Sequence, residues 1–269
     1  MIDAFNWHYE CKYRPSWLSC IDESMSSWLN KFCPGFMMVP RKPHPFGNEY
    51  HTIADGDKGK PILFQIKLVE GKDRPKLANG RWAFPTKWED EGYTKTIELL
   101  LDMTAPIHRT GKVVTGDSGF CVAEGVMAFD AKGVYGQFLI KKRRYWPKHV
   151  PGDFIDQHMA GKRLGENETY VQEIDGTRFL VHCCKDAEWV TKIMSMHGVL
   201  EENQDHATWR GVDGQWKTFK YDKPFLRHNR GKHWVDDVNN RRHDPIGLEE
   251  VWHTKWWPTR QFTFICSVA

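Results

Sequence analysis

Three aspartates stand at positions where the chain could build a site for divalent cations. Asp22 follows the apolar run "SWLSCI", Asp117 follows "KVVTG", and Asp236 lies in the helix-like segment "KHWVDDVNN". Hard cations such as Mg²⁺ prefer carboxylate oxygens, and two metal ions about 4 Å apart can stabilise the attacking and leaving oxygens of a phosphodiester. The same aspartates could be ordinary turn residues or helix N-caps, so their spacing leaves both interpretations open.

A different chemistry is suggested by "GDSG" at 116–119, the tetrad around the nucleophilic serine of trypsin-like proteases. In those proteases a glycine follows the tetrad, whereas Phe120 follows it here. His44, His51 and His108 precede the tetrad, but none stands in the Ala-Ala-His-Cys setting of the catalytic histidine. The pattern around Ser118 is a strand followed by a helix and not a β-barrel, which argues against a protease.

The composition is that of a soluble globular protein with a sizeable core. The 269 residues are 40% hydrophobic and 27% charged, and 13 tryptophans predict an aromatic-rich core. The formal net charge of +3 is too small to indicate a nucleic-acid partner by itself. Positive charge is dense at Lys141, Lys142, Arg143 and Arg144 and again between residues 227 and 243. For each of these runs, an ordinary solvated surface explains the charge as well as a binding site does.

Cysteine usage and the N-terminus indicate a reducing intracellular compartment. The seven cysteines form no C-x-x-C pair, which argues against a disulfide scaffold and against a structural zinc site. The first residues lack the basic and apolar regions of a signal peptide. No apolar run approaches the ~20 residues of a membrane span, so we expect a soluble intracellular protein without a membrane partner.

Hydrophobic patterning in the first half of the chain predicts alternating helices and strands. The expected elements are strands at 16–22 and 59–71, a helix at 94–107, a strand at 111–117, a helix at 118–133 and a strand at 134–147. The first helix depends on the spacing of Ile97, Leu100, Leu101 and Thr104, and the second ends at Gly133. This order is typical of an α/β sheet with helical crossovers.

The second half of the chain has another pattern. Polar, glycine-rich residues at 149–169 indicate a linker or insertion, and 170–183 predicts a hairpin built on an Asp175–Gly176 turn. A further short strand is expected at 192–198, before the polar stretch 201–215. The expected helices are 223–244 and 248–269, with Pro258 as a kink or break in the second.

Stretches along nearly the whole chain match, in order, the motifs of one family. They are "SWLSCIDESM", "MVPRKPHPFGNEYHTIAD", "VVTGDSGFCVAEGVMAFDAKGVYG", "FLIKKRRYWP", "VHCCKDAEWVTKIMSMHG", "FLRHNRGKHWVDDVNN" and "KWWPTRQFTFICSVA". In this order they resemble the catalytic domain of piggyBac-type transposases and transposase-derived proteins. The N-terminal DNA-binding regions of that family and its C-terminal cysteine-rich zinc module have no counterpart here.

The resemblance implies an RNase H-like α/β fold, a mixed sheet flanked by helices, with a smaller β-containing insertion between the second and third acids. It implies a core at 1–147, an insertion at 148–215 and a helical part of the core at 216–269.

The resemblance also implies catalytic residues. The three catalytic acids of the family correspond to Asp22, Asp117 and Asp236. In the family these acids together bind two divalent metal ions, Mg²⁺ or Mn²⁺. A further acid of the family falls on Asn239 here, and the adjacent Asp237 is the alternative carboxylate.

The implied activity is metal-dependent DNA cleavage and strand transfer by a nuclear transposase. Its partner would be DNA, as transposon ends and as target, with a homodimer as the candidate assembly. Lys141, Lys142, Arg143 and Arg144 would neutralise phosphates without reading sequence. The alternative is a catalytically degenerate or domesticated transposase-derived domain that binds DNA or protein. Retention of three acids favours catalysis, and Asn239 favours its loss.

Overall fold

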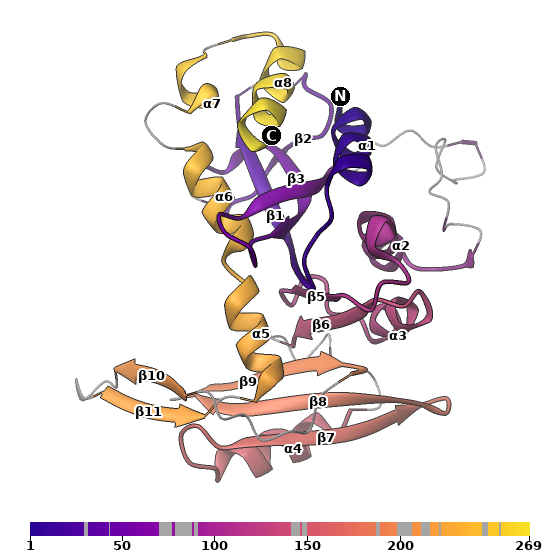
Figure 1. Ribbon diagram of the computed structural model, residues 1–269, viewed down its shortest axis with the longest axis vertical. Helices are drawn as coiled ribbons and strands as arrows, with labels where there is room; N and C mark the ends of the chain where they lie inside the picture. The colour runs from indigo at the N-terminus through magenta and orange to yellow at the C-terminus, as the bar shows by residue number, and fades with distance from the viewer. Residues whose placement is uncertain are drawn as a thin grey trace. The chain divides into compact units, whose positions relative to one another are not determined.

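The structure is a computed structural model that describes residues 1–29, 32–42, 44–69, 77–78, 88, 91–140, 146, 150–186, 189–197, 206–210, 216–220, 222–243, 247–252 and 254–269. Its contacts divide the chain into two units, whose elements are labelled in Figure 1. The first unit comprises Met1–Ile107 and His233–Ala269, and the second comprises His108–Lys232.

An antiparallel sheet forms the centre of the first unit. Its strands are β1 (Leu18–Ser27), β2 (Phe36–Met38), β3 (Phe46–Asp55) and β4 (Ile62–Leu68). β3 pairs with β1 along one edge and with both β2 and β4 along the other. The sheet buries Ile21, Ile53 and Leu63 completely, so the predicted strand at 59–71 is confirmed as β4.

Helices pack around this sheet. They are α1 (Ile2–Lys12), α2 (Lys95–Thr104), α6 (Trp234–Arg242), α7 (Leu248–Val251) and α8 (Trp257–Val268), with a 3-10 turn, η3 (Ala105–Ile107), after α2. The predicted amphipathic helix at 94–107 is confirmed, because Ile97, Leu100, Leu101 and Thr104 are all buried on one face of α2.

The N-terminal helix α1 contacts β4. The side-chain amide of Asn6 donates to the carbonyl oxygen of Ile66 at 2.8 Å, and its oxygen accepts from the Ile66 N–H at 2.9 Å. Asn6 therefore bonds to β4 as a neighbouring strand would. The sequence analysis did not predict α1, because its residues show little helical segregation of apolar from polar side chains.

The second unit is built on a mixed sheet. Its strands are β5 (Val113–Gly116), β6 (Tyr135–Leu139), β7 (Asn167–Ile174), β8 (Thr177–Asp186) and β9 (Trp189–Ser195). β5 and β6 are parallel, and β6, β9, β8 and β7 then follow as antiparallel neighbours. A separate hairpin pairs β10 (His206–Arg210) with β11 (Trp216–Lys220). The predicted α/β class is confirmed.

Three helices of the second unit accompany its sheet. They are α3 (Ala123–Ala131), which connects the parallel strands β5 and β6, α4 (Gly152–Ala160) and α5 (Lys223–Gly231). Figure 1 shows α4 and α5 on opposite faces of β7, β8 and β9. Phe225 of α5 packs with Cys184 and Ile193 on one of these faces.

Several predicted boundaries in the first half of the chain are wrong. Asp22 lies in the middle of β1 and not at its end, because pairing with β3 continues to Ser27. The helix expected from residue 118 starts only at Ala123, since 117–120 form a turn. Ser118 therefore does not open a helix. The predicted loop at 72–92 lies mostly outside the described residues.

Other boundaries differ in the second half. The polar segment 149–169 contains α4, whose Ile155 and Met159 are buried one turn apart. The helix expected at 223–244 is two helices, α5 and α6. Pro258 stands in the first turn of α8 and begins it, because a proline there lacks only an N–H that no helix bond needs.

The predicted hairpin is confirmed as β7–β8. Asp175 and Gly176 have φ values of 48° and 79°, as a two-residue type I′ turn requires. All seven cysteines are free thiols. Among the helices that the structure describes, none has the length and apolar character to cross a membrane.

Candidate active site

Asp22 lies in the part of β1 that pairs with β3. It stands opposite Thr52 of β3, and the Thr52 hydroxyl donates to the Asp22 carbonyl oxygen at 3.0 Å. The Asp22 carboxylate accepts the backbone N–H of Glu23 at 2.8 Å. Side chains alternate between the faces of a strand, so Asp22 shares its face with Ser26.

Glu23 points to the other face of β1 and makes a different set of contacts. Its carboxylate pairs with Arg41 at 2.9 Å, and Lys42 donates to its carbonyl oxygen at 3.4 Å. Both cations come from the "PRKP" stretch, which is thereby held against the strand of Asp22. Burial, and next the neighbouring Glu23 carboxylate, raises the pKa of Glu49.

Asp236 lies in the first turn of α6, where the helix dipole favours a carboxylate. Helix α6 contacts β1, β3 and β4. It buries Trp234, Val235, Val238 and Arg242 and leaves Asp236 exposed. The Asp236 carboxylate makes no hydrogen bond or ion pair with any described residue.

Close contact with the turn after β3 fixes the start of α6. A Cβ added to Gly56 would lie 2.7 Å from the indole of Trp234. Only glycine leaves room for this contact, and Trp234 is two residues before Asp236. The position of the Asp236 carboxylate therefore depends on Gly56.

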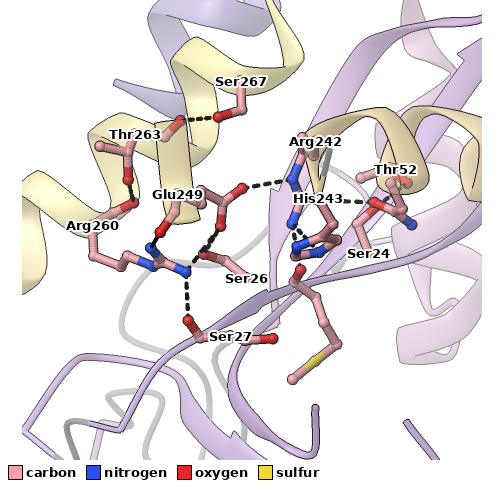
Figure 2. Close-up of polar contacts among 12 residues, drawn as sticks. Ser24, Ser26, Ser27, Thr52, Arg242, His243, Glu249, Arg260, Thr263 and Ser267 are labelled. Atoms are coloured by element: carbon pink, nitrogen blue, oxygen red, sulfur yellow. Dashed lines mark hydrogen bonds and ion pairs between the residues drawn. The ribbon is translucent and has the colours of Figure 1, made fainter. Parts of the chain in front are cut away.

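A buried ion pair fixes the other end of α6 (Figure 2). Arg242 donates from Nε to Oε1 of Glu249 at 2.6 Å, and both side chains are 0% exposed. Its Nη2 donates to the Met25 carbonyl oxygen of β1 at 2.5 Å, and its Nη1 donates to Oδ1 of Asn239 at 2.8 Å. The Phe264 ring lies 4.5 Å below the guanidinium.

The remaining contacts of Glu249 connect α7 and α8 to β1. The hydroxyl of Ser26 donates to Oε2 of Glu249 at 2.7 Å. Arg260 of α8 lies 3.4 Å from the same oxygen and donates to the Ser27 carbonyl oxygen at 2.6 Å. Because Ser26 and Asp22 lie on one face of β1, Asp22 is on the face that carries these helices. We call Arg242, Glu249, Ser26 and Arg260 the buried charge cluster.

The two flanks of α6 distinguish Asp236 from Asp237. Residues three or four apart share a flank of a helix, so Asp236 lies near Asn239, which Arg242 joins to β1. Asp237 lies near Arg241, which donates to the Pro61 carbonyl oxygen just before β4. Asp236 is therefore on the β1 side of the helix, and Asp237 is on the β4 side.

Asp117 belongs to the second unit and directly follows β5. One carboxylate oxygen accepts the Gly119 N–H at 2.6 Å, which shapes a tight turn. The other oxygen has no hydrogen-bond partner in the described part of the chain. Two residues earlier, the hydroxyl of Thr115 lies 3.0 Å from Nδ1 of buried His228 on α5, a contact that the sequence analysis missed.

The structure thus brings the elements of Asp22 and Asp236 together within the first unit and places Asp117 at a strand end of the second. Taken separately, neither unit contains a group of three or more His, Cys, Asp or Glu side chains arranged for a metal, as far as its residues are described. Lys141, Lys142, Arg143 and Arg144 lie outside the described residues. The buried charge cluster was not predicted, although Arg242 on the apolar side of α6 was a signal for it.

Comparison with known proteins decides the family. The sequence profile of the family described as Transposase IS4 matches residues 1–269, the whole chain. The chain belongs to this transposase family. No curated protein matches the chain.

Among solved structures, this chain resembles the piggyBac transposase in its synaptic complex with hairpin DNA, determined by cryo-EM. The two share 14% sequence identity at a TM-score of 0.68, over 99% of this chain and 48% of that one. The likeness confirms the predicted fold, a mixed sheet flanked by helices. The chain spans about half the length of the solved transposase.

Proposed function

We propose that this transposase domain cleaves and joins DNA phosphodiester bonds with Asp22, Asp117 and Asp236. The observation that carries the proposal is the placement of Asp22 on the face of β1 that the buried charge cluster joins to α6. The same helix presents Asp236 on its β1 side. Asp117 supplies the third carboxylate, as its strand-end position and the family resemblance indicate.

The chemistry of these donors fits a pair of Mg²⁺ or Mn²⁺ ions, which prefer carboxylate oxygens and keep open positions for water and phosphate. One Asp117 oxygen and the whole Asp236 carboxylate have no partner among the described residues. Bound there, the ions would polarise the phosphodiester and lower the pKa of a nucleophilic water or 3′-hydroxyl.

The residues of the chain itself orient the DNA. Arg41 is largely exposed and lies beside the strand of Asp22, where it can bind a phosphate. Lys141, Lys142, Arg143 and Arg144 stay predicted phosphate contacts. DNA as the partner is supported by the hairpin DNA bound to the similar piggyBac transposase. This proposal also includes a nuclear location, assembly as a homodimer, and a division of the chain into domains at 1–147, 148–215 and 216–269.

A nicking assay tests the proposal. The purified chain is incubated with a hairpin or nicked duplex in Mg²⁺ or Mn²⁺, and the products are separated on a denaturing gel. We expect cleavage by the wild-type chain and by Asp175→Asn, a control that changes an acid in a turn where asparagine is equally suited. Asp117→Asn should show only background cleavage. Equal background cleavage by wild type and Asp117→Asn would refute the catalytic proposal and favour a DNA- or protein-binding domain derived from a transposase.

A further inference from the structure

The second unit has a pocket beside helix α4 that the three aspartates do not use. Its volume is about 510 Å³, within the range of small-ligand sites. The register of β8 and β9 pairs Lys185 with Val190 and Cys183 with Lys192. Cross-strand partners and residues two apart in a strand share a face, so both lysines lie on one face of the sheet. It is the face of α4, because Asp156 of that helix pairs with Lys192.

Two ammonium groups reach the pocket from this face. Lys185 and Lys192 both line it and are diagonal neighbours on adjacent strands, a spacing that long side chains can bridge. Lys192 Nζ pairs with Oδ1 of Asp156 at 2.7 Å and lies 5.2 Å from the centre of the Trp146 ring. Lys185 has no ion pair or side-chain hydrogen bond with any residue that the structure describes. Two lysines against one aspartate leave one positive charge, carried by Lys185.

The surroundings of the pocket do not neutralise this charge. Ile140, and Ala160 at the end of α4, are apolar lining residues. On the next strand, the carboxylate of Glu168 in β7 pairs with Lys162. An ammonium beside apolar side chains is screened less than one in open water, so the pocket favours an anion.

We propose that Lys185 and Lys192 bind one phosphate group in this pocket. A phosphodiester carries one negative charge, which matches the one positive charge of the pocket, and lysine binds phosphate as a point charge. The sequence continues from Ile140 directly into Lys141, Lys142, Arg143 and Arg144, the phosphate contacts predicted from the sequence, which makes DNA the favoured source. Only this source rests on the proposed function, because a free phosphate has the same chemistry.

Two measurements test the site, both in EDTA so that no metal-dependent reaction occurs. In the first, a fluorescein-labelled blunt duplex is titrated with the full chain at a series of NaCl concentrations, and anisotropy is recorded. In the second, the melting temperature of the chain is compared in inorganic phosphate and in NaCl of equal ionic strength. The variants are Lys185→Gln and Asp156→Asn. The controls are Lys12→Gln on the surface of α1 and Trp189→Ala, which the register places on the opposite face of β9.

We expect Lys185→Gln to bind the duplex about tenfold more weakly than wild type, the lower range for loss of a hydrogen bond to a charged group. The slope of log K against log[salt] should become shallower by about 1, as loss of one phosphate contact predicts. Asp156→Asn should bind up to about fivefold more tightly, because it releases Lys192 and removes a competing negative charge. Phosphate should raise the melting temperature of the wild type and not that of Lys185→Gln, and both controls should behave like the wild type.

The two measurements separate the sources of the phosphate. Weaker duplex binding by Lys185→Gln would assign the phosphate to DNA, and a loss of the phosphate-dependent stabilisation alone would assign it to a free phosphate. Wild-type behaviour of Lys185→Gln in both measurements would overturn the proposal. So would an Asp156→Asn variant that binds as weakly as Lys185→Gln, since disruption of the pocket would then explain both losses. Neither measurement contains metal, so the outcome does not depend on the nicking assay.

Discussion

The carboxylate of Glu249 and the guanidinium of Arg242 form an ion pair that is closed to solvent and completed by bonds to β1. Every additional partner of the pair, such as Ser26, Asn239 and the Met25 carbonyl, satisfies a remaining donor or acceptor. Removing one member of such a pair leaves an uncompensated buried charge, which is far more costly than the pair itself.

Loss of either charge should therefore destabilise the first unit strongly. We expect Glu249→Gln and Arg242→Met each to lower the free energy of unfolding by about 3–5 kcal/mol, measured by urea denaturation. The exposed pair of Arg178 and Glu173 provides the control, since Glu173→Gln should cost about 1 kcal/mol or less. Similar small losses at both pairs would show that the buried charge cluster does not hold the helices.

The flanks of α6 predict which of two adjacent acids is needed for cleavage. Asp236→Asn should reduce nicking to background, because this carboxylate lies on the β1 side of the helix. Asp237→Asn should retain most of the activity, since Asp237 lies beside Arg241 and Pro61. Both residues are exposed, so each change should lower stability by no more than about 1 kcal/mol, the contribution of a carboxylate in the first turn of a helix. The reverse order of activities in the nicking assay would contradict our placement of the third acid.

The family resemblance aligns Asn239 with a further acid, and the contact that Asn239 makes in the structure is structural. Its oxygen accepts a hydrogen bond from Arg242, and a bond to a charged group contributes about 1.5–3 kcal/mol. We expect Asn239→Ala to lose about this much stability and Asn239→Asp to lose none, because aspartate also offers an acceptor. Urea denaturation of the two variants measures the difference. Equal stabilities of the alanine and aspartate variants would rule out this role.

Buried His182 should make the second unit less stable in acid. It hydrogen-bonds with Thr169 and Ser195, and burial, followed by the charge of Arg227, lowers its pKa to about 4. The unfolded chain takes up this proton near pH 6.5 and the folded chain only near pH 4. Stability is therefore full above pH 6.5 and falls by up to about 3 kcal/mol as the pH drops to 4.

Denaturation curves at a series of pH values measure this loss. His182→Gln keeps polar atoms for Thr169 and Ser195 but has no proton to take up, so its stability should fall less between pH 6.5 and 4. Parallel pH profiles for the variant and the wild type would show that His182 is not the source of the dependence.

Local chemistry allowed much of the fold to be predicted. The apolar spacing of α2, the Asp175–Gly176 turn and the strand before Asp117 all follow from rules that act within a few residues. The exact extent of β1 was not predictable in this way. Its second half alternates serine with other residues and is a strand because β3 and the buried charge cluster bind it, and these partners are distant in sequence.

The candidate site shows the same limit. Motif resemblance named Asp22, Asp117 and Asp236, but no local pattern could show that Arg242 would reach Met25, 217 residues away. Contacts of this kind depend on tertiary packing.

The bond between Asn6 and Ile66 has a consequence for how copies of the chain meet. Among the described strands, β4 pairs with β3 alone and along one edge, and an open strand edge is a template on which a second molecule can extend the sheet. The side-chain amide of Asn6 occupies both polar groups of Ile66 on that edge, since its nitrogen donates to the Ile66 carbonyl and its oxygen accepts from the Ile66 N–H. Helix α1 thus protects this part of the chain against aggregation through strand addition.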